Sequence, residues 1–202
     1  MSNLKALIDN IEKKDFTNMS AFEIEKIYQT IKNIRYENRQ LLVFQYFQIL
    51  DIKAKICLEQ KNKKDALIIF DQIIVEIKPE FVKDRLKYAE IYSNALSKKA
   101  DLSNKEDYFG IMDIYDKAIE VRATLTRYYG GTYEILSAYD ELSIARMMRK
   151  LTGINREAKT MSMYRYNRAR KIFDRFNAHH LGQYALIIDT IDKEIRNMNL
   201  GK

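Results

Sequence analysis

The sequence predicts an all-α fold, built as an array of antiparallel helices. Glycine (6) and proline (1) are scarce among the 202 residues, although sheet proteins and long loops use both for turns. Apolar residues recur with a helical period along most of the chain, and no segment shows the alternation of a half-buried strand. The polar connections between the helical segments are short, and short connections force neighbouring helices to run antiparallel.

About nine helices account for this pattern. We expect them at residues 2–13, 21–34, 37–60, 64–78, 81–98, 103–127, 132–151, 155–175 and 179–198. Two of them begin at a capping box, in which a serine hydroxyl and a glutamate carboxylate each satisfy an unpaired amide. These boxes are Ser20-Ala21-Phe22-Glu23 and Ser103-Asn104-Lys105-Glu106.

Breaks between the helices follow from proline, glycine and asparagine. We expect Pro79 to lie between the fourth and fifth helices, and Gly130-Gly131 to form the clearest break. Gly153 is expected to cap the end of the seventh helix, and Asn177 to cap the start of the last one.

The length and composition suit one soluble domain. A chain of 202 residues with 47% hydrophobic residues can bury a sizeable core. No window approaches the ~18 uncharged apolar residues of a membrane span, and the charged start of the chain lacks the apolar stretch of a signal peptide. Cys57 is the only cysteine, so it forms no intramolecular disulfide, and we expect a buried thiol in a cytoplasmic protein.

Residues 47–80 carry a pattern of small and aromatic residues over 34 positions. Ala54 is the small residue of a first helix, with Cys57 in an aromatic position. Ala66 and Phe70 form an Ala-x3-Phe element in a second helix, and Pro79 follows near the end. This segment resembles a tetratricopeptide (TPR) repeat, although Lys53 stands where the pattern has leucine.

Two weaker units extend the resemblance to about residue 176. Their pattern residues are Ala89, Tyr92, Ile111, Tyr115 and Ala118 in one unit, and Ala145, Met148, Ala169, Phe173 and Phe176 in the other. The resemblance implies a single helical-repeat domain over 1–202, wound as a right-handed superhelix. Within it, 1–36 would form N-terminal helices, 37–176 TPR-like hairpins and 178–198 a C-terminal capping helix. TPR-like proteins bind peptides or partner helices on their concave face.

The net charge of +7 arises from one part of the chain. Residues 121–180 contain 12 Lys/Arg and 5 Asp/Glu, and 12 − 5 equals the whole excess. This uneven charge favours an acidic partner. Tyr164, Arg168, Lys171 and Arg175 form a basic stripe on the helix over 155–175, opposite its apolar face. The stripe is either an ordinary solvated surface or a nucleic-acid contact within the basic region 146–175.

The helix over 132–151 is apolar on most sides and yet carries Glu141, Arg146 and Arg149. Charges on an enclosed helix need partners, so we expect an ion pair between neighbouring helices. The alternative is a basic groove for a carboxylate or phosphorylated ligand. The predicted binding residues are Lys55, Tyr139, Arg146, Arg149, Arg165 and Arg168, and TPR-like registration would add Asp51 and Leu142 to the concave face.

Catalytic and metal motifs are absent from the sequence. His179 and His180 are adjacent, so on a helix they point ~100° apart and would chelate poorly. There is no phosphate-binding loop and no nucleophile elbow. We therefore predict a protein without catalytic activity or cofactor, which binds a protein or an acidic peptide as an adaptor and can self-associate. The alternative is nucleic-acid binding.

Overall fold

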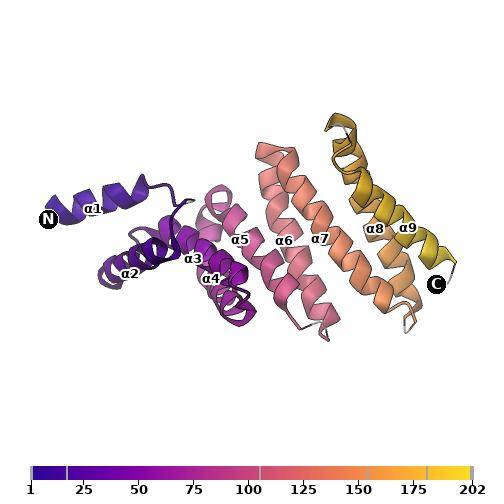
Figure 1. Ribbon diagram of the computed structural model, residues 1–202, viewed down its shortest axis with the longest axis horizontal. Coiled ribbons are helices and arrows are strands. Elements are labelled where there is room, and N and C mark those ends of the chain that lie inside the picture. The colour runs from indigo at the N-terminus through magenta and orange to yellow at the C-terminus, as the bar shows by residue number, and fades with distance from the viewer. Residues whose placement is uncertain (1, 17, 105, 154, 181, 201–202) are drawn as a thin grey trace. The chain divides into compact units, whose positions relative to one another are not determined.

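A computed structural model describes residues 2–16, 18–104, 106–153, 155–180 and 182–200. Within these ranges the chain forms nine α-helices and no strand, which confirms the predicted all-α fold (Figure 1). The helices are α1 (Ser2–Glu12), α2 (Ala21–Glu37), α3 (Val43–Glu59), α4 (Lys63–Lys83), α5 (Arg85–Leu102), α6 (Tyr108–Tyr129), α7 (Gly131–Lys150), α8 (Arg156–His179) and α9 (Ala185–Asn199). None of these helices is long and apolar enough to cross a membrane.

The helices gather into two compact units, Met1–Leu102 and Ser103–Lys202. In the first unit α2 packs on α3, α3 on α4 and α4 on α5, and α3 also touches α5. In the second unit α6 packs on α7, α7 on α8 and α8 on α9 (Figure 1). Each unit is therefore an array of neighbouring helices, as predicted. The organisation of the whole chain as one repeat domain stays a prediction.

Small residues let the helices of the first unit approach closely. Ala54 of α3, Ala66 of α4 and Ala89 of α5 are all fully buried, as the repeat pattern requires. Larger side chains fill the remaining core, and those with almost no exposed surface include Ile24, Ile31, Phe47, Ile49, Leu50, Phe70, Ile73 and Ile77. Each such side chain contributes about 1.5–3 kcal/mol when it leaves water.

The core of the second unit joins α7, α8 and α9. Its buried residues are Ala138, Leu142, Ala145, Tyr166, Ala169, Phe173, Ile191 and Met198. The predicted apolar face of α8 is confirmed by burial of Tyr166, Ala169 and Phe173, and the Ser162 hydroxyl on the same face donates to the Ala145 carbonyl at 2.8 Å. The C-terminal helix α9 thus closes this core with Ile191 and Met198.

Two helix starts were predicted as capping boxes, and one is confirmed. At α2 the Glu23 amide donates to the Ser20 hydroxyl at 3.3 Å, and the Ser20 amide donates to the Glu23 carboxylate at 2.9 Å. The prediction that a capping box at Ser103 opens the sixth helix was wrong. Lys105, which belongs to that motif, lies outside the described residues. Helix α6 instead begins after Asp107, whose carboxylate accepts from the Gly110 amide at 3.0 Å.

Pro79 does not separate α4 from α5, so that prediction was wrong. Helix α4 continues through Pro79 to Lys83, and α5 begins at Arg85. Proline lacks the amide that would bond to the carbonyl four residues earlier, here Val75. Because Val75 and Pro79 both lie on the exposed face of α4, water can satisfy that carbonyl, and the helix can continue.

The later breaks follow the sequence in part. Gly130 ends α6 and precedes α7 with φ of 75°, as expected of a glycine break. Gly153 is not a cap, because α7 ends at Lys150 with Leu151 after it. Asn177 lies inside α8, which is longer than predicted. Its side chain nevertheless accepts from the Tyr184 amide at 2.9 Å, directly before α9 begins.

Candidate functional site

The predicted binding face of α7 is partly covered by α9. The Arg146 side chain donates to both carboxylate oxygens of Glu194 on α9, at 3.1 and 3.2 Å. Tyr139 is exposed, and its ring lies edge-on to Phe173 at 5.0 Å. Arg149 is half-buried, and Leu142 is only 2% exposed within the core. The expectation that Leu142 lines an open groove was therefore wrong.

Glu141 forms the ion pair between neighbouring helices that its burial predicted. Its carboxylate is only 1% exposed and lies 2.8 Å from Arg165 Nη1 and 2.9 Å from Arg168 Nη1, both on α8. Arg165 also binds Asp116 of α6 at 2.8 Å. The structure thus brings two of the predicted binding residues, Arg165 and Arg168, together around one buried carboxylate.

The charge of Arg165 is maintained by these contacts. Its burial acts to lower the pKa of the guanidinium, but the hydrogen bonds and charges of Glu141 and Asp116 outweigh this effect and raise the pKa. A permanently charged arginine between two carboxylates satisfies the buried Glu141, which would otherwise be costly to enclose. This arrangement explains the contact between α7 and α8 better than it explains a ligand site.

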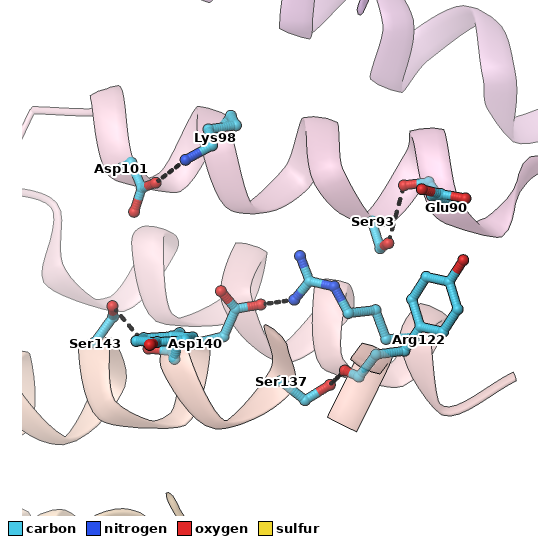
Figure 2. Close-up of polar contacts among 10 residues, drawn as sticks. Glu90, Ser93, Lys98, Asp101, Arg122, Ser137, Asp140 and Ser143 are labelled. Atoms are coloured by element: carbon cyan, nitrogen blue, oxygen red, sulfur yellow. Dashed lines mark hydrogen bonds and ion pairs between the residues drawn. The ribbon is translucent and has the colours of Figure 1, made fainter. Parts of the chain in front are cut away.

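Other arginines of the second unit are also engaged in ion pairs. Figure 2 shows the Arg122 guanidinium of α6 directed at the Asp140 carboxylate of α7, with both side chains buried. On α8, Arg175 pairs with Glu134 of α7, and Arg170 pairs with Asp192 of α9 at 2.6 Å. Six of the twelve Lys/Arg in 121–180 therefore pair with carboxylates of neighbouring helices, namely Arg122, Arg146, Arg165, Arg168, Arg170 and Arg175.

The predicted basic stripe of α8 is only partly available to a ligand. Arg168 and Arg175 each have a carboxylate partner. Lys171 and Tyr164 are exposed, and Lys171 has no ion pair with any described residue. A nucleic-acid contact would therefore depend on few free charges, although such binding draws its affinity from many phosphate contacts.

Lys55 lies in the first unit, whereas the other predicted binding residues lie in the second. Its exposed ammonium group pairs with Asp51 one helical turn earlier, at 2.7 Å. The Asp51 carboxylate is itself largely buried, so Lys55 compensates a negative charge within the first unit. This contact provides no geometry for a ligand.

A cleft of about 640 Å³ opens in the first unit at the C-terminal end of α2. Sequence reasoning did not identify it. The lining comes from α2, from the connection that follows it, and from α3 and α4. The lining residues are Lys32, Asn33, Arg35, Tyr36, Arg39, Gln40, Tyr46, Glu76 and Glu80.

Three cations line this cleft, and one of them, Arg35, is held by contacts with neighbouring groups. Arg35 donates to the Leu41 carbonyl at 3.3 Å, and its guanidinium lies 4.6 Å from the centre of the Tyr46 ring. Lys32 and Arg39 are exposed and form no ion pair or hydrogen bond with any residue that the structure describes. Two positive charges of the cleft are thus free to meet a ligand.

Two carboxylates of α4, one helical turn apart, also line the cleft. Glu76 accepts a hydrogen bond from Gln72 at 2.9 Å, and Glu80 pairs with Lys83 at 2.9 Å. Gln72 also donates to the Tyr46 hydroxyl at 2.7 Å. Burial, followed by the nearby charge of Glu76, raises the pKa of Tyr46, so its hydroxyl stays protonated in ordinary buffers.

Packed aromatic rings support the bottom of the cleft. The Tyr46 ring stacks on Tyr28 at 6.2 Å and lies edge-on to Phe47 at 5.4 Å. Phe47 in turn contacts Tyr88 of α5 at 6.1 Å. Tyr36 differs from these rings because it is 91% exposed at the edge of the cleft. The cleft therefore combines a rigid base with an accessible aromatic ring.

The sequence contains a signal for this cleft that the charge count did not use. Arg35, Tyr36 and Arg39 form a short basic and aromatic cluster at the end of α2. This cluster lies outside residues 121–180, which carry the basic excess. Glu76 and Glu80 are distant from it in the sequence and come close to it only in the folded chain. Pairing of α2 with α3 and α3 with α4 was needed to bring these groups together.

No group of metal-ligating side chains occurs among the described residues. His179 and His180 are exposed at the end of α8. Cys57 is half-buried rather than fully buried, and burial raises the pKa of its thiol, which disfavours the reactive thiolate. The cleft at the end of α2, in contrast, combines charged groups with an exposed aromatic ring, which suits it to a ligand.

No protein-family model matches the chain, and neither a curated protein nor a solved structure matches it.

Proposed function

We propose that this protein is a non-catalytic scaffold that binds a protein or peptide partner through a helical array of TPR-like type. Support comes from the close packing of α3, α4 and α5 around Ala54, Ala66 and Ala89. The contact of α3 with α5 also fits successive hairpins stacked in register. Arrays of this kind offer extended surfaces for partner binding.

The observation that carries the proposal is the set of free cations in the cleft of the first unit. Lys32 and Arg39 face a space of about 640 Å³ and have no partner among the described residues. Exposed Tyr36 lies beside them. Arginine and tyrosine are enriched where proteins bind partners, because both combine packing area with a polar group.

Nucleic-acid binding through residues 146–175 is the second candidate, and Lys159 and Lys171 favour it most. Both are exposed on α8 and have no partner in the described part of the chain. Arg146, Arg165 and Arg168 weaken this candidate, because carboxylates of α7 and α9 already bind them. A phosphate backbone would have to compete with those pairs.

Affinity capture with matched charge reversals tests the proposal. The full chain and two double variants, Lys32→Glu/Arg39→Glu and Lys159→Glu/Lys171→Glu, are immobilised and exposed to nuclease-treated extract of the source cell. Bound proteins are then quantified by mass spectrometry. We expect a defined protein partner that is lost with the first variant and retained with the second. Loss with the second variant only, or recovery of nucleic acid alone from untreated extract, would contradict the proposal.

A further inference from the structure

We propose that the cleft at the end of α2 binds an acidic peptide segment in an extended conformation. Carboxylates of the peptide would pair with Lys32 and Arg39, while backbone amides of the peptide would face Glu76 and Glu80. This inference rests on the proposed function and specifies the chemistry of the partner at that site.

The charge balance of the cleft selects an anionic ligand. Its two carboxylates already have donors, since Gln72 binds Glu76 and Lys83 binds Glu80. Arg35 is occupied by the Leu41 carbonyl and the Tyr46 ring. Among the charged groups that line the cleft, only Lys32 and Arg39 form no ion pair or hydrogen bond with a described residue, although Lys53 and, more weakly, the nearby Lys32 lower the pKa of the Glu25 carboxyl. A ligand that brings carboxylates therefore satisfies what the protein leaves unsatisfied.

The size of the cleft excludes a small inorganic anion as its full occupant. Its 640 Å³ falls within the range of about 300–1,000 Å³ that is typical of sites for organic ligands. At about 30 Å³ per molecule in liquid water, this space holds on the order of twenty water molecules. An ion bound at Lys32 or Arg39 would leave most of that water in place, whereas a peptide segment displaces it.

The acidic side of the cleft distinguishes a peptide from a nucleic acid. Glu76 and Glu80 lie one turn apart on α4, and a phosphate backbone passing them would meet two like charges. A peptide backbone instead presents N–H donors, and each carboxylate has acceptor positions beyond the one that its present partner uses. A peptide with acidic side chains along one edge therefore offers carboxylates to Lys32 and Arg39 and backbone amides to Glu76 and Glu80.

The cleft is already shaped in the unbound protein. Leu42, which precedes α3, adopts a left-handed conformation with φ of 52° and is only 3% exposed. Such a conformation costs a non-glycine residue about 1–2 kcal/mol. It holds the connection in which the Leu41 carbonyl meets Arg35. Because Tyr46 also packs against Tyr28 and Phe47, the backbone around the cleft needs little ordering when a ligand binds.

A single tryptophan placed at the cleft reports on binding. The chain contains no tryptophan, so Tyr36→Trp in the full chain creates a unique fluorophore at an exposed position. The probe is a decapeptide of alternating glutamate and serine. We expect a saturable blue shift of the emission, with an affinity that decreases as salt is added. A peptide with glutamine in place of glutamate serves as the uncharged control.

Charge reversals in the same Tyr36→Trp chain locate the contact. The double variant Lys32→Glu/Arg39→Glu should bind the glutamate peptide with an affinity at least tenfold lower. The matched pair Lys63→Glu/Lys64→Glu, on exposed residues at the start of α4 outside the cleft lining, should change the affinity less than twofold. Equal effects of the two pairs would overturn the proposal. So would equal binding of the glutamine peptide, tighter binding of a single-stranded RNA decamer, or no saturable shift up to about 1 mM peptide.

The outcome is distinguishable from failure of the proposed function. If the captured partner depends on Lys32 and Arg39 but the glutamate peptide does not bind, the ligand class is wrong and the scaffold function stands. If no captured protein depends on these residues, the proposed function fails at this site, whatever the peptide does.

Discussion

Glu141 of α7 and Arg165 of α8 form an ion pair of 2.8 Å, although the Glu141 side chain is only 1% exposed. Arg168 approaches the same carboxylate at 2.9 Å, and Asp116 holds the other side of Arg165. A buried carboxylate with two arginines ties the register of α7 and α8 to specific residues. It also engages both arginines that the sequence offered to an acidic ligand, although the Arg168 side chain is still 45% exposed.

Removing Glu141 should destabilise the second unit more than an exposed ion pair would. Breaking a buried pair costs about 3–5 kcal/mol, and we expect Glu141→Ala to fall near the lower end because Arg165 keeps Asp116. Urea unfolding measures the loss. Lys193→Ala, which breaks only an exposed i,i+4 pair with Asp189, should cost under about 1 kcal/mol. Similar losses for the two variants would refute a special role for Glu141.

Gly131→Ala should destabilise the packing of α7 on α8. A Cβ atom at Gly131 would lie 2.2 Å from the Phe176 ring, so the ring must shift. We expect a loss of about 1–2 kcal/mol in thermal or urea unfolding. Gly153→Ala is the matched control, since nothing lies within 4 Å of a Cβ there. The double variant Gly131→Ala/Phe176→Leu should recover part of the loss, and no recovery would argue against this contact.

Lys61→Gly should stabilise the first unit. Lys61 follows α3 with φ of 61°, and the amide of Asn62 bonds to the Cys57 carbonyl at 2.8 Å, as in a Schellman motif. Glycine relieves the left-handed strain of about 1–2 kcal/mol but loses more chain entropy, so we expect a net gain of about 0.5–1 kcal/mol. Lys64→Gly, inside α4, should instead destabilise. A loss with Lys61→Gly would mean that the lysine side chain contributes contacts of its own.

Stability should decline in alkaline solution in part through Tyr166. Burial, followed by the nearby charge of Glu194, raises the pKa of Tyr166 to about 12, above the ordinary value of about 10. Between these values the unfolded chain loses the proton and the folded chain keeps it. The contribution of Tyr166 is therefore complete below pH ~10 and decreases by up to ~1.4 kcal/mol per pH unit as the pH rises toward ~12.

Tyr166→Phe isolates this effect. Its hydroxyl has no hydrogen bond of good geometry within the described ranges, although Glu194 and Arg149 lie close enough to shift its pKa in opposite directions. Replacing it should leave stability at pH 7 unchanged or raise it slightly, because a buried polar group without a partner is removed. The slope of stability against pH between about 10 and 12 should become shallower. An unchanged slope would mean that Tyr166 ionises normally in the folded protein.

The sequence predicted the helices well, because helical periodicity and helix caps depend on residues only a few positions apart in the sequence. Ser20 and Glu23 illustrate this, since both partners of the capping box lie in one turn. Predictions of helix boundaries failed where solvent exposure allowed a helix to continue, or where a different residue capped the helix. Pro79 was tolerated inside α4 on an exposed face, and Asp107 replaced Ser103 at the start of α6.

The candidate site was less predictable, because it depends on contacts between residues distant in sequence. The charge excess of 121–180 pointed to Arg165 and Arg168, and periodicity placed Glu141 on an enclosed helix. Only the folded structure showed that both arginines pair with the Glu141 carboxylate. The charge count did not point to the cleft at the end of α2, because Lys32 and Arg39 lie outside 121–180, in the part of the chain whose charge is balanced as a whole. In the fold, neither of them forms an ion pair with a described residue.

The most direct test of the central claim is the amount of partner captured by the two charge-reversed chains, relative to the unaltered protein. The account predicts that Lys32→Glu/Arg39→Glu captures at least tenfold less partner, while Lys159→Glu/Lys171→Glu captures an amount within twofold of the unaltered chain. Added glutamate–serine decapeptide should also release the partner from the unaltered chain. Equal capture by both variants, or a partner that stays bound at saturating peptide, would contradict the account.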